Sequence, residues 1–190
     1  MTEQPRTSPL RRVLRTALLH ADTYEEIEAD RASIRQALVI VALASISAGL
    51  GAWFRTLAGH GLSEGALPFS VYLAVVTLEV PVVWLASSAF AYMVGATFLA
   101  GPETETDYAE VLRTTGFAFT PGLLYAFGWL PDPIGLGALA LARLWILVGC
   151  IVAVRQALDF TTIRAVGTFG SATVLLWLVL WGLTVVPLPG

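Results

Sequence analysis

Five long apolar runs, separated by short polar segments, fill most of the chain. They cover approximately residues 36–54, 68–100, 110–130, 134–154 and 165–186. A hydrocarbon core about 30 Å thick needs roughly 20 apolar residues per spanning α-helix, and each run meets that length. In lipid, a single segment satisfies its own peptide groups only as a helix. The pattern therefore predicts an all-α, polytopic membrane protein with five transmembrane helices in residues 34–187.

Residues 1–33 are more polar, and we expect a cytoplasmic region with a short amphipathic helix. Ser8 and Pro9 suit the first positions of a helix over residues 8–20. Its apolar positions recur at helical spacing: Leu10, Val13, Leu14, Ala17 and Leu18. Off that face fall Arg11, Arg12 and Arg15. Two interpretations stay open: a helix on an anionic membrane surface with its arginines at the headgroups, or a helix packed on the rest of the protein.

The entry to the first span carries two further signals. Thr23 and Glu26 have the spacing of a capping box, so a second helix is predicted to begin at Thr23 and to continue into the span. Small residues gather in the later part of the span: Ala44, Ser45, Ser47, Ala48, Gly49 and Gly51. Because small residues let helices approach closely in lipid, this face is predicted to pack on a neighbouring helix.

The arginines indicate the orientation. All 11 basic residues are arginines, and with the N-terminus inside, nine fall on the inner side, including Arg113 at the inner entry to the third span, whereas Arg55 falls in an outer loop and Arg143 falls deep within a span. Positive residues are retained on the cytoplasmic side during insertion. We therefore expect a cytoplasmic N-terminus and a C-terminus on the outside.

Composition narrows the class of protein. Hydrophobic residues make up 56% of the chain and charged residues 13%, which argues against a water-soluble domain. No basic tract suggests nucleic acid, and the single Cys150 excludes an intrachain disulfide. The sequence has no phosphate-binding glycine loop and no zinc-ligand spacing, and its only histidines are His20 and His60. We expect no catalytic residues, no metal and no cofactor.

Two ionisable residues lie inside the predicted spans, Glu79 in the second and Arg143 in the fourth. Each is roughly ten positions from the outer end of its span, and at about 1.5 Å per residue both are about 15 Å deep. A charge at mid-membrane costs at least about 2.5–3.5 kcal/mol, so an intramembrane pair is the natural hypothesis. Such a pair serves either as a proton or ion relay or substrate contact, or as a structural link between the two spans.

Two prolines are candidate kinks. Pro81 follows Glu79 by two residues and donates no hydrogen bond to the carbonyl of Thr77. Pro121 likewise leaves the carbonyl of Phe117 without its helical donor. Kinks beside a charge are typical of transport sites and also occur in structural bundles.

Two stretches resemble the Yip-one (Ypt-interacting protein) domain family of multi-pass membrane proteins. GPETETDYAEVLRTTGFAFTPGLLYAFGWLP resembles its middle segment, and LWILVGCIVAVRQALDFTTIRAVGTF is similar to its next one. The resemblance covers about residues 10 to 186 and implies a five-helix membrane protein without enzymatic activity. Eukaryotic relatives act in vesicle traffic and contact small GTPases. Their long N-terminal region is short here, which puts GTPase binding in doubt.

These features lead to one functional hypothesis and one alternative. The first is a non-enzymatic protein that organises or binds other membrane proteins or lipids, with self-association as one form of binding. The alternative is a small transporter or channel that uses Glu79 and Arg143. The all-arginine basic set, with abundant Ala, Gly and Leu, suggests a GC-rich bacterium and hence a bacterial inner membrane.

Overall fold

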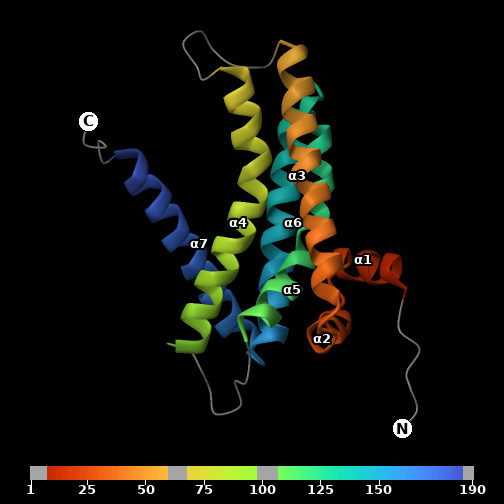
Figure 1. Ribbon diagram of the computed structural model, residues 1–190, viewed down its shortest axis with the longest axis vertical. Coiled ribbons are helices and arrows are strands. Elements are labelled where there is room, and N and C mark those ends of the chain that lie inside the picture. Colours follow the sequence, from red (N-terminus) through yellow and green to blue (C-terminus); the bar gives the residue numbers. More distant parts are fainter. Residues whose placement is uncertain (1–7, 60–67, 98–106, 186–190) are drawn as a thin grey trace.

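The computed structural model describes residues 8–59, 68–97 and 107–185, and within these ranges the chain forms eight helices and no strand (Figure 1). The predicted all-α class is confirmed. The helices are α1 (Pro9–Ala17), α2 (Ala21–Ala29), α3 (Ser33–Leu57), α4 (Phe69–Thr97), α5 (Tyr108–Ala118), the 3-10 helix η1 (Thr120–Trp129), α6 (Ile134–Ala157) and α7 (Thr162–Val185). Outside the described ranges lie Arg6, His60, and the predicted span ends at residues 98–100 and 186–187.

Three described helices are long and apolar enough to cross a membrane: α3, α4 over Phe69–Gly95, and α6. They coincide with the first, second and fourth predicted spans. Figure 1 shows that α3, α5 with η1, and α7 run one way along the bundle, whereas α4 and α6 run the other way. The count of five spans and the orientation of the termini stay predictions.

The third predicted span is not one continuous α-helix, so the prediction of a single helix over residues 110–130 is wrong. The α-helix ends at Ala118 and a 3-10 helix follows from Thr120 to Trp129. Pro121 stands at this junction, where it donates no backbone hydrogen bond. Because a 3-10 helix rises about 2.0 Å per residue, η1 still extends roughly 20 Å along the bundle.

The centre of the bundle is formed by α3, η1 and α6, which pack closely through small residues. A methyl group on Gly51 of α3 would lie 2.1 Å from the carbonyl oxygen of Tyr125 in η1. A methyl group on Gly122 would lie 2.7 Å from the Cβ of Ala44. The small-residue face of the first span therefore packs on a neighbour, as predicted, because the backbones meet directly.

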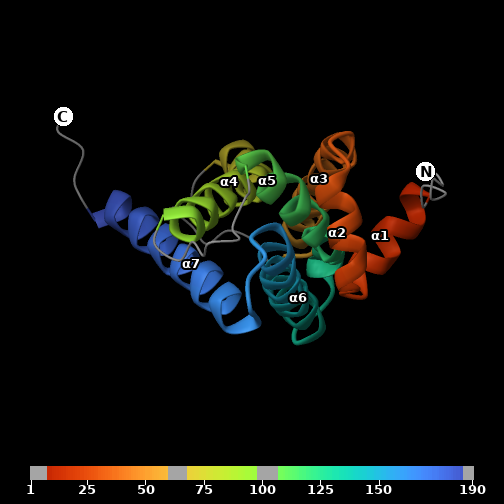
Figure 2. The same ribbon diagram turned by 90° about the horizontal axis from the view of Figure 1, so that it is seen from below.

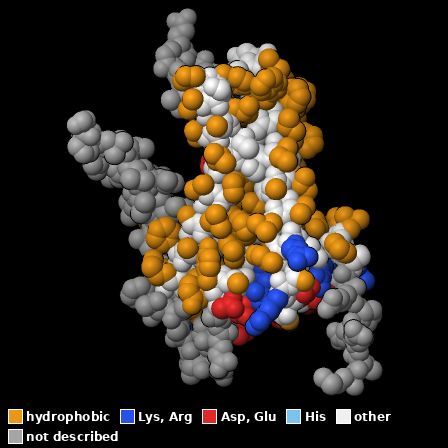
Figure 3. Space-filling view, viewed as in Figure 1, with side chains coloured by type: hydrophobic (Ala, Val, Ile, Leu, Met, Phe, Trp, Pro, Cys, Tyr) orange, Lys and Arg blue, Asp and Glu red, His pale blue; other side chains and the backbone are white. Residues whose placement is uncertain are grey.

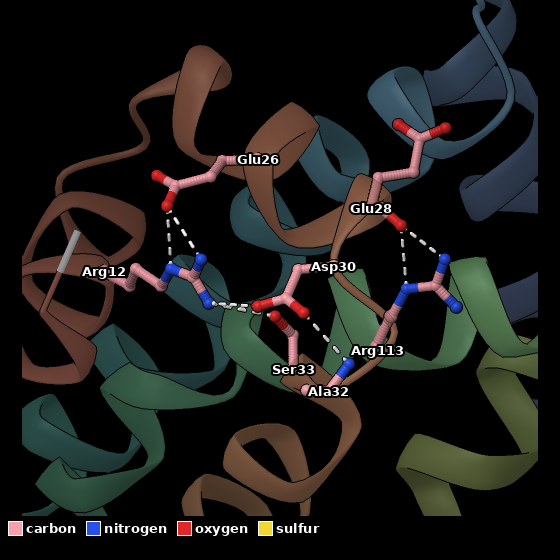
Figure 4. A network of polar contacts seen from close by, with 7 residues as sticks. All are labelled: Arg12, Glu26, Glu28, Asp30, Ala32, Ser33 and Arg113. Carbon is pink, nitrogen blue, oxygen red and sulfur yellow. Dashed lines mark hydrogen bonds and ion pairs between the residues drawn. The ribbon is translucent and has the colours of Figure 1, made fainter. Parts of the chain in front are cut away.

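Charged side chains gather at one end of the bundle, below a long hydrophobic shaft (Figure 3). This charged end contains α1, α2, the starts of α3 and α5 and the end of α6 (Figures 1 and 2). Its most buried ion is Arg12, which is 3% exposed. The guanidinium donates to Glu26 Oε1 at 2.8 and 3.0 Å, to Asp30 Oδ2 at 2.8 Å and to Ser33 Oγ at 3.1 Å (Figure 4). Arg12 thus joins α1 to α2 and to the start of α3.

The predicted continuity of the second helix with the first span is wrong. α2 begins at Ala21 rather than Thr23, and it ends before Asp30. The Asp30 carboxylate accepts from the backbone N–H of Ala32 at 3.1 Å as well as from Arg12, which stabilises a turn before α3. The break allows α2 to lie across the end of the bundle (Figure 1).

A second buried arginine, Arg113 of α5, binds the backbone of α2. Its Nε donates to the carbonyl oxygen of Glu28 at 2.9 Å, while the Glu28 carboxylate points away (Figure 4). Burial, followed by the nearby charges of Asp159 and Glu110, raises the pKa of the Glu28 carboxyl from 4.5 to about 7. Glu28 is therefore a carboxyl group at the charged end that titrates near neutral pH.

This pKa gives stability a pH dependence. Folded protein keeps the Glu28 proton up to about pH 7, whereas unfolded chain loses it near 4.5, so the free energy of unfolding falls as pH rises between these values. We expect the melting temperature of the wild type in detergent to fall over this window, and that of Glu28→Gln to change much less. Glu25→Gln, a neighbouring change, should keep most of the slope. Equal slopes in wild type and Glu28→Gln would contradict the assignment.

Alanine substitutions at Gly51 and Gly137 form a matched pair that tests the close packing at the centre of the bundle. A methyl group on Gly51 would collide with backbone, whereas one on Gly137 of α6 meets nothing within 4 Å. Gly51→Ala should destabilise by about 1–3 kcal/mol through overpacking. Gly137→Ala should be neutral or stabilise by up to about 1 kcal/mol, because alanine favours a helix. Unfolding of both variants in mixed micelles measures the difference, and equal effects would refute the close contact.

Candidate intramembrane site

The structure places Glu79 of α4 and Arg143 of α6 on the lining of one cavity of about 170 Å³. Its walls are formed by α3, α4, η1 and α6, and most of the lining is apolar. The polar side chains in the lining are Arg55, Tyr72, Glu79, Tyr125 and Arg143. Glu79 and Arg143, which were predicted to lie at one depth, therefore line the same cavity.

Glu79 and Arg143 are both exposed on the isolated chain, and the structure describes no direct ion pair between them. Tyr125 lies close enough to interact electrostatically with both charges. The helices that carry the two charges, α4 and α6, make little contact with each other. Both α5 and α7 pack on each of them, whereas α3 packs on α4 and η1 packs on α6. The pair as a direct contact stays a prediction, and what the structure shows is two charges and a phenol around a common cavity.

Arg55 lies on the same cavity lining, at the end of α3 far from the charged end (Figure 1). It donates to Asp132 Oδ1 and Oδ2 at 3.2 and 3.1 Å and to the carbonyl oxygen of Gly128 at 3.0 Å. This contact joins the end of α3 to the turn between η1 and α6. Sequence reasoning placed Arg55 in an outer loop and missed this role, although the acidic turn at Asp132 offered a partner.

Both proline sites have their released carbonyl oxygens satisfied by hydroxyl groups. The carbonyl of Thr77, which Pro81 leaves without a donor, accepts from Ser45 Oγ of α3. The carbonyl of Phe117, which Pro121 leaves without its usual helical donor, accepts from Thr120 Oγ1 at 2.7 Å and also from a backbone N–H at the end of α5. α4 runs through Pro81 as a single helix. The kink predicted at Pro81 is untested, whereas Pro121 stands where the helix changes type.

The cavity has the chemistry of a binding site. Its lining presents carboxylate, guanidinium and phenol groups beside apolar walls, and among the described residues it contains no serine, cysteine or histidine. Glu79 also borders a shallow apolar groove on α4, formed by Ser70, Val71, Ala74, Val75, Leu78, Val82 and Val83. Glu79 thus borders both the cavity and the groove on α4.

A family model described as the Yip1 domain matches residues 15–184. The chain belongs to the Yip1 domain family. This match extends from α1 to α7 and confirms the family resemblance found in the sequence. Searches of curated proteins and of solved structures found no match. With its long apolar helices, the chain is a membrane protein of the Yip1 type.

A double-mutant cycle tests the hydrogen bond that Ser45 donates to the carbonyl of Thr77. Ser45→Ala leaves the Thr77 carbonyl without a donor and should lower stability by about 0.5–1.5 kcal/mol. In a Pro81→Ala background the new backbone N–H restores a helical donor, so Ser45→Ala should cost little. Unfolding free energies of the four proteins measure the coupling. Additive effects of the two changes would contradict the explanation.

Proposed function

We propose that this protein is a non-enzymatic membrane protein of the Yip1 type that binds other components of the membrane, lipids or proteins, at the cavity between α4 and α6. The observation that carries the proposal is the exposure of Glu79 and Arg143 on one cavity of membrane-crossing helices. A charge at that depth costs several kcal/mol unless it is neutralised. A polar group of a lipid or of a partner helix would supply that neutralisation.

The surroundings of the cavity favour a ligand that arrives from within the bilayer. Beside the charged residues, Leu78 of α4 is 60% exposed and Leu144 of α6 is 61% exposed. These side chains suit acyl chains or an apolar helix surface rather than water. We further propose that the chain crosses the membrane five times, with the charged end in the cytoplasm of a bacterial cell, in accord with the arginine distribution.

Site-specific photo-crosslinking in native membranes tests the proposal. A benzoylphenylalanine at Val76, on the cavity lining, should give discrete adducts that Glu79→Gln reduces several-fold. The matched control is the same probe at Leu50, which is exposed on α3 away from the cavity lining, and its adducts should not respond to Glu79→Gln. Identical adducts at both positions, or no effect of Glu79→Gln, would overturn the binding role of the cavity.

A small transporter or channel is the second candidate. It is favoured by the charged cavity lying beside Pro81, where a side-chain hydroxyl of a neighbouring helix replaces a backbone hydrogen bond. Proteoliposomes should then pass protons or small ions, and Glu79→Gln should abolish the flux without lowering the melting temperature. Glu25→Gln, on α2, serves as the charge control. Absence of any flux through the wild-type protein excludes this alternative.

A further inference from the structure

On α1, polar side chains are buried and leucine side chains are exposed. Arg12 and Thr16, on the polar face, are 3% and 1% exposed, whereas Leu10, Leu14 and Leu18 are 70%, 57% and 67% exposed. The leucines recur every four residues and form a single stripe, and Arg12 lies on the opposite side of the helix. The side of α1 that carries Arg12 and Thr16 therefore packs on the protein, and the leucine stripe is turned outward, with the exposed Arg11 at its edge.

The place of α1 in the fold explains what the leucine stripe meets. Figure 1 shows α1 lying across the bundle axis, nearer the middle of the bundle than α2. The indole Nε1 of Trp145 in α6 donates to the carbonyl oxygen of Ala17 at 2.8 Å. Trp145 precedes Arg155 by ten residues, which is about 15 Å along α6. The end of α1 is thus fixed well above the level at which α6 becomes charged.

The contact of α1 with the start of α3 places α1 at the same height along the bundle. Arg12 binds Ser33, the first residue of α3, and the exposed apolar side chains of α3 begin at Leu38, about 8 Å further along. The helix α1 therefore lies at the border between the charged end and the hydrophobic shaft. Figure 3 shows hydrophobic side chains at the position of α1, with charged side chains gathered below them.

We propose that α1 is an in-plane membrane helix whose leucine stripe, Leu10, Leu14 and Leu18, inserts into the acyl chains of the leaflet at the charged end. The occupant is lipid because the stripe continues the apolar surface of the shaft at the same level. Arg12 sets the orientation: its ion pairs with Glu26 and Asp30 hold the polar face against α2 and leave the leucines toward the bilayer. This inference is independent of the cavity and of the proposed function.

Spin labels measure the environment of the stripe directly. With the only cysteine replaced by Cys150→Ala, a nitroxide is attached at Leu14→Cys or, as the aqueous control, at Glu25→Cys, which is exposed on α2. Both proteins are reconstituted in vesicles of phosphatidylethanolamine and phosphatidylglycerol. Collisions with oxygen, which concentrates in lipid, are compared with collisions with a water-soluble nickel chelate. At Leu14 the oxygen-to-nickel ratio should exceed that at Glu25 several-fold.

Each other outcome overturns the proposal. A label at Leu14 that is as accessible to nickel as the label at Glu25 places the stripe in water. A label shielded from both oxygen and nickel means that a second copy or another part of the chain covers it. Because Leu14 is exposed, Leu14→Cys should leave the melting temperature unchanged. As a further check, Arg12→Gln should lower the oxygen-to-nickel ratio at Leu14, since the helix loses its fixed orientation.

Discussion

Every peptide group within the bilayer has to find its hydrogen-bond partner inside the protein, and this constraint decides the form of the Yip1 bundle. Regular helices meet it in α3 and α6. Where proline removes a donor, hydroxyl groups contribute: Ser45 reaches the Thr77 carbonyl across helices, and Thr120 bonds the Phe117 carbonyl alongside a backbone N–H. Ser45 can reach the Thr77 carbonyl only where α3 and α4 approach closely. The small residues that allow this approach therefore also make the hydrogen bond possible.

The two ends and the middle of the bundle are stabilised by different interactions. The middle depends on shape, since Gly51 and Gly122 let backbones meet without any side chain between them. The charged end depends on two buried guanidinium groups, Arg12 and Arg113, which are expensive to bury and therefore need their full set of acceptors. The far end has the Arg55 contact with Asp132. Shape complementarity is insensitive to pH, whereas the charged end contains Glu28, whose raised pKa makes its contribution to stability fall as pH rises.

Length and apolar periodicity were sufficient to predict the long helices, because a run that has to cross lipid leaves only one backbone solution. Counting residues along two spans also predicted that Glu79 and Arg143 lie at one depth. Such a count does not tell which way each side chain points around its helix, so it did not reveal that both line a cavity with Tyr125. The sequence showed a break at Pro121, but a 3-10 helix of ten residues depends on how closely η1 packs on α3. The sequence left open whether Arg12 meets lipid headgroups or packs on the protein, because its partners reach it only after the chain turns at Asp30.

The hydrogen bonds of the N-terminal helices have a consequence for biogenesis. The described partners of Arg12 all lie within the next 21 residues, so these contacts can form as soon as α2 and the start of α3 have been synthesised. The remaining partners come much later: Arg113 is 85 residues from Glu28, Trp145 is 128 residues from Ala17, and Gln156 is 131 residues from Glu25. The N-terminal helices are therefore synthesised long before the parts of α5 and α6 that hold them against the bundle, and they reach their final position only after those helices have been made.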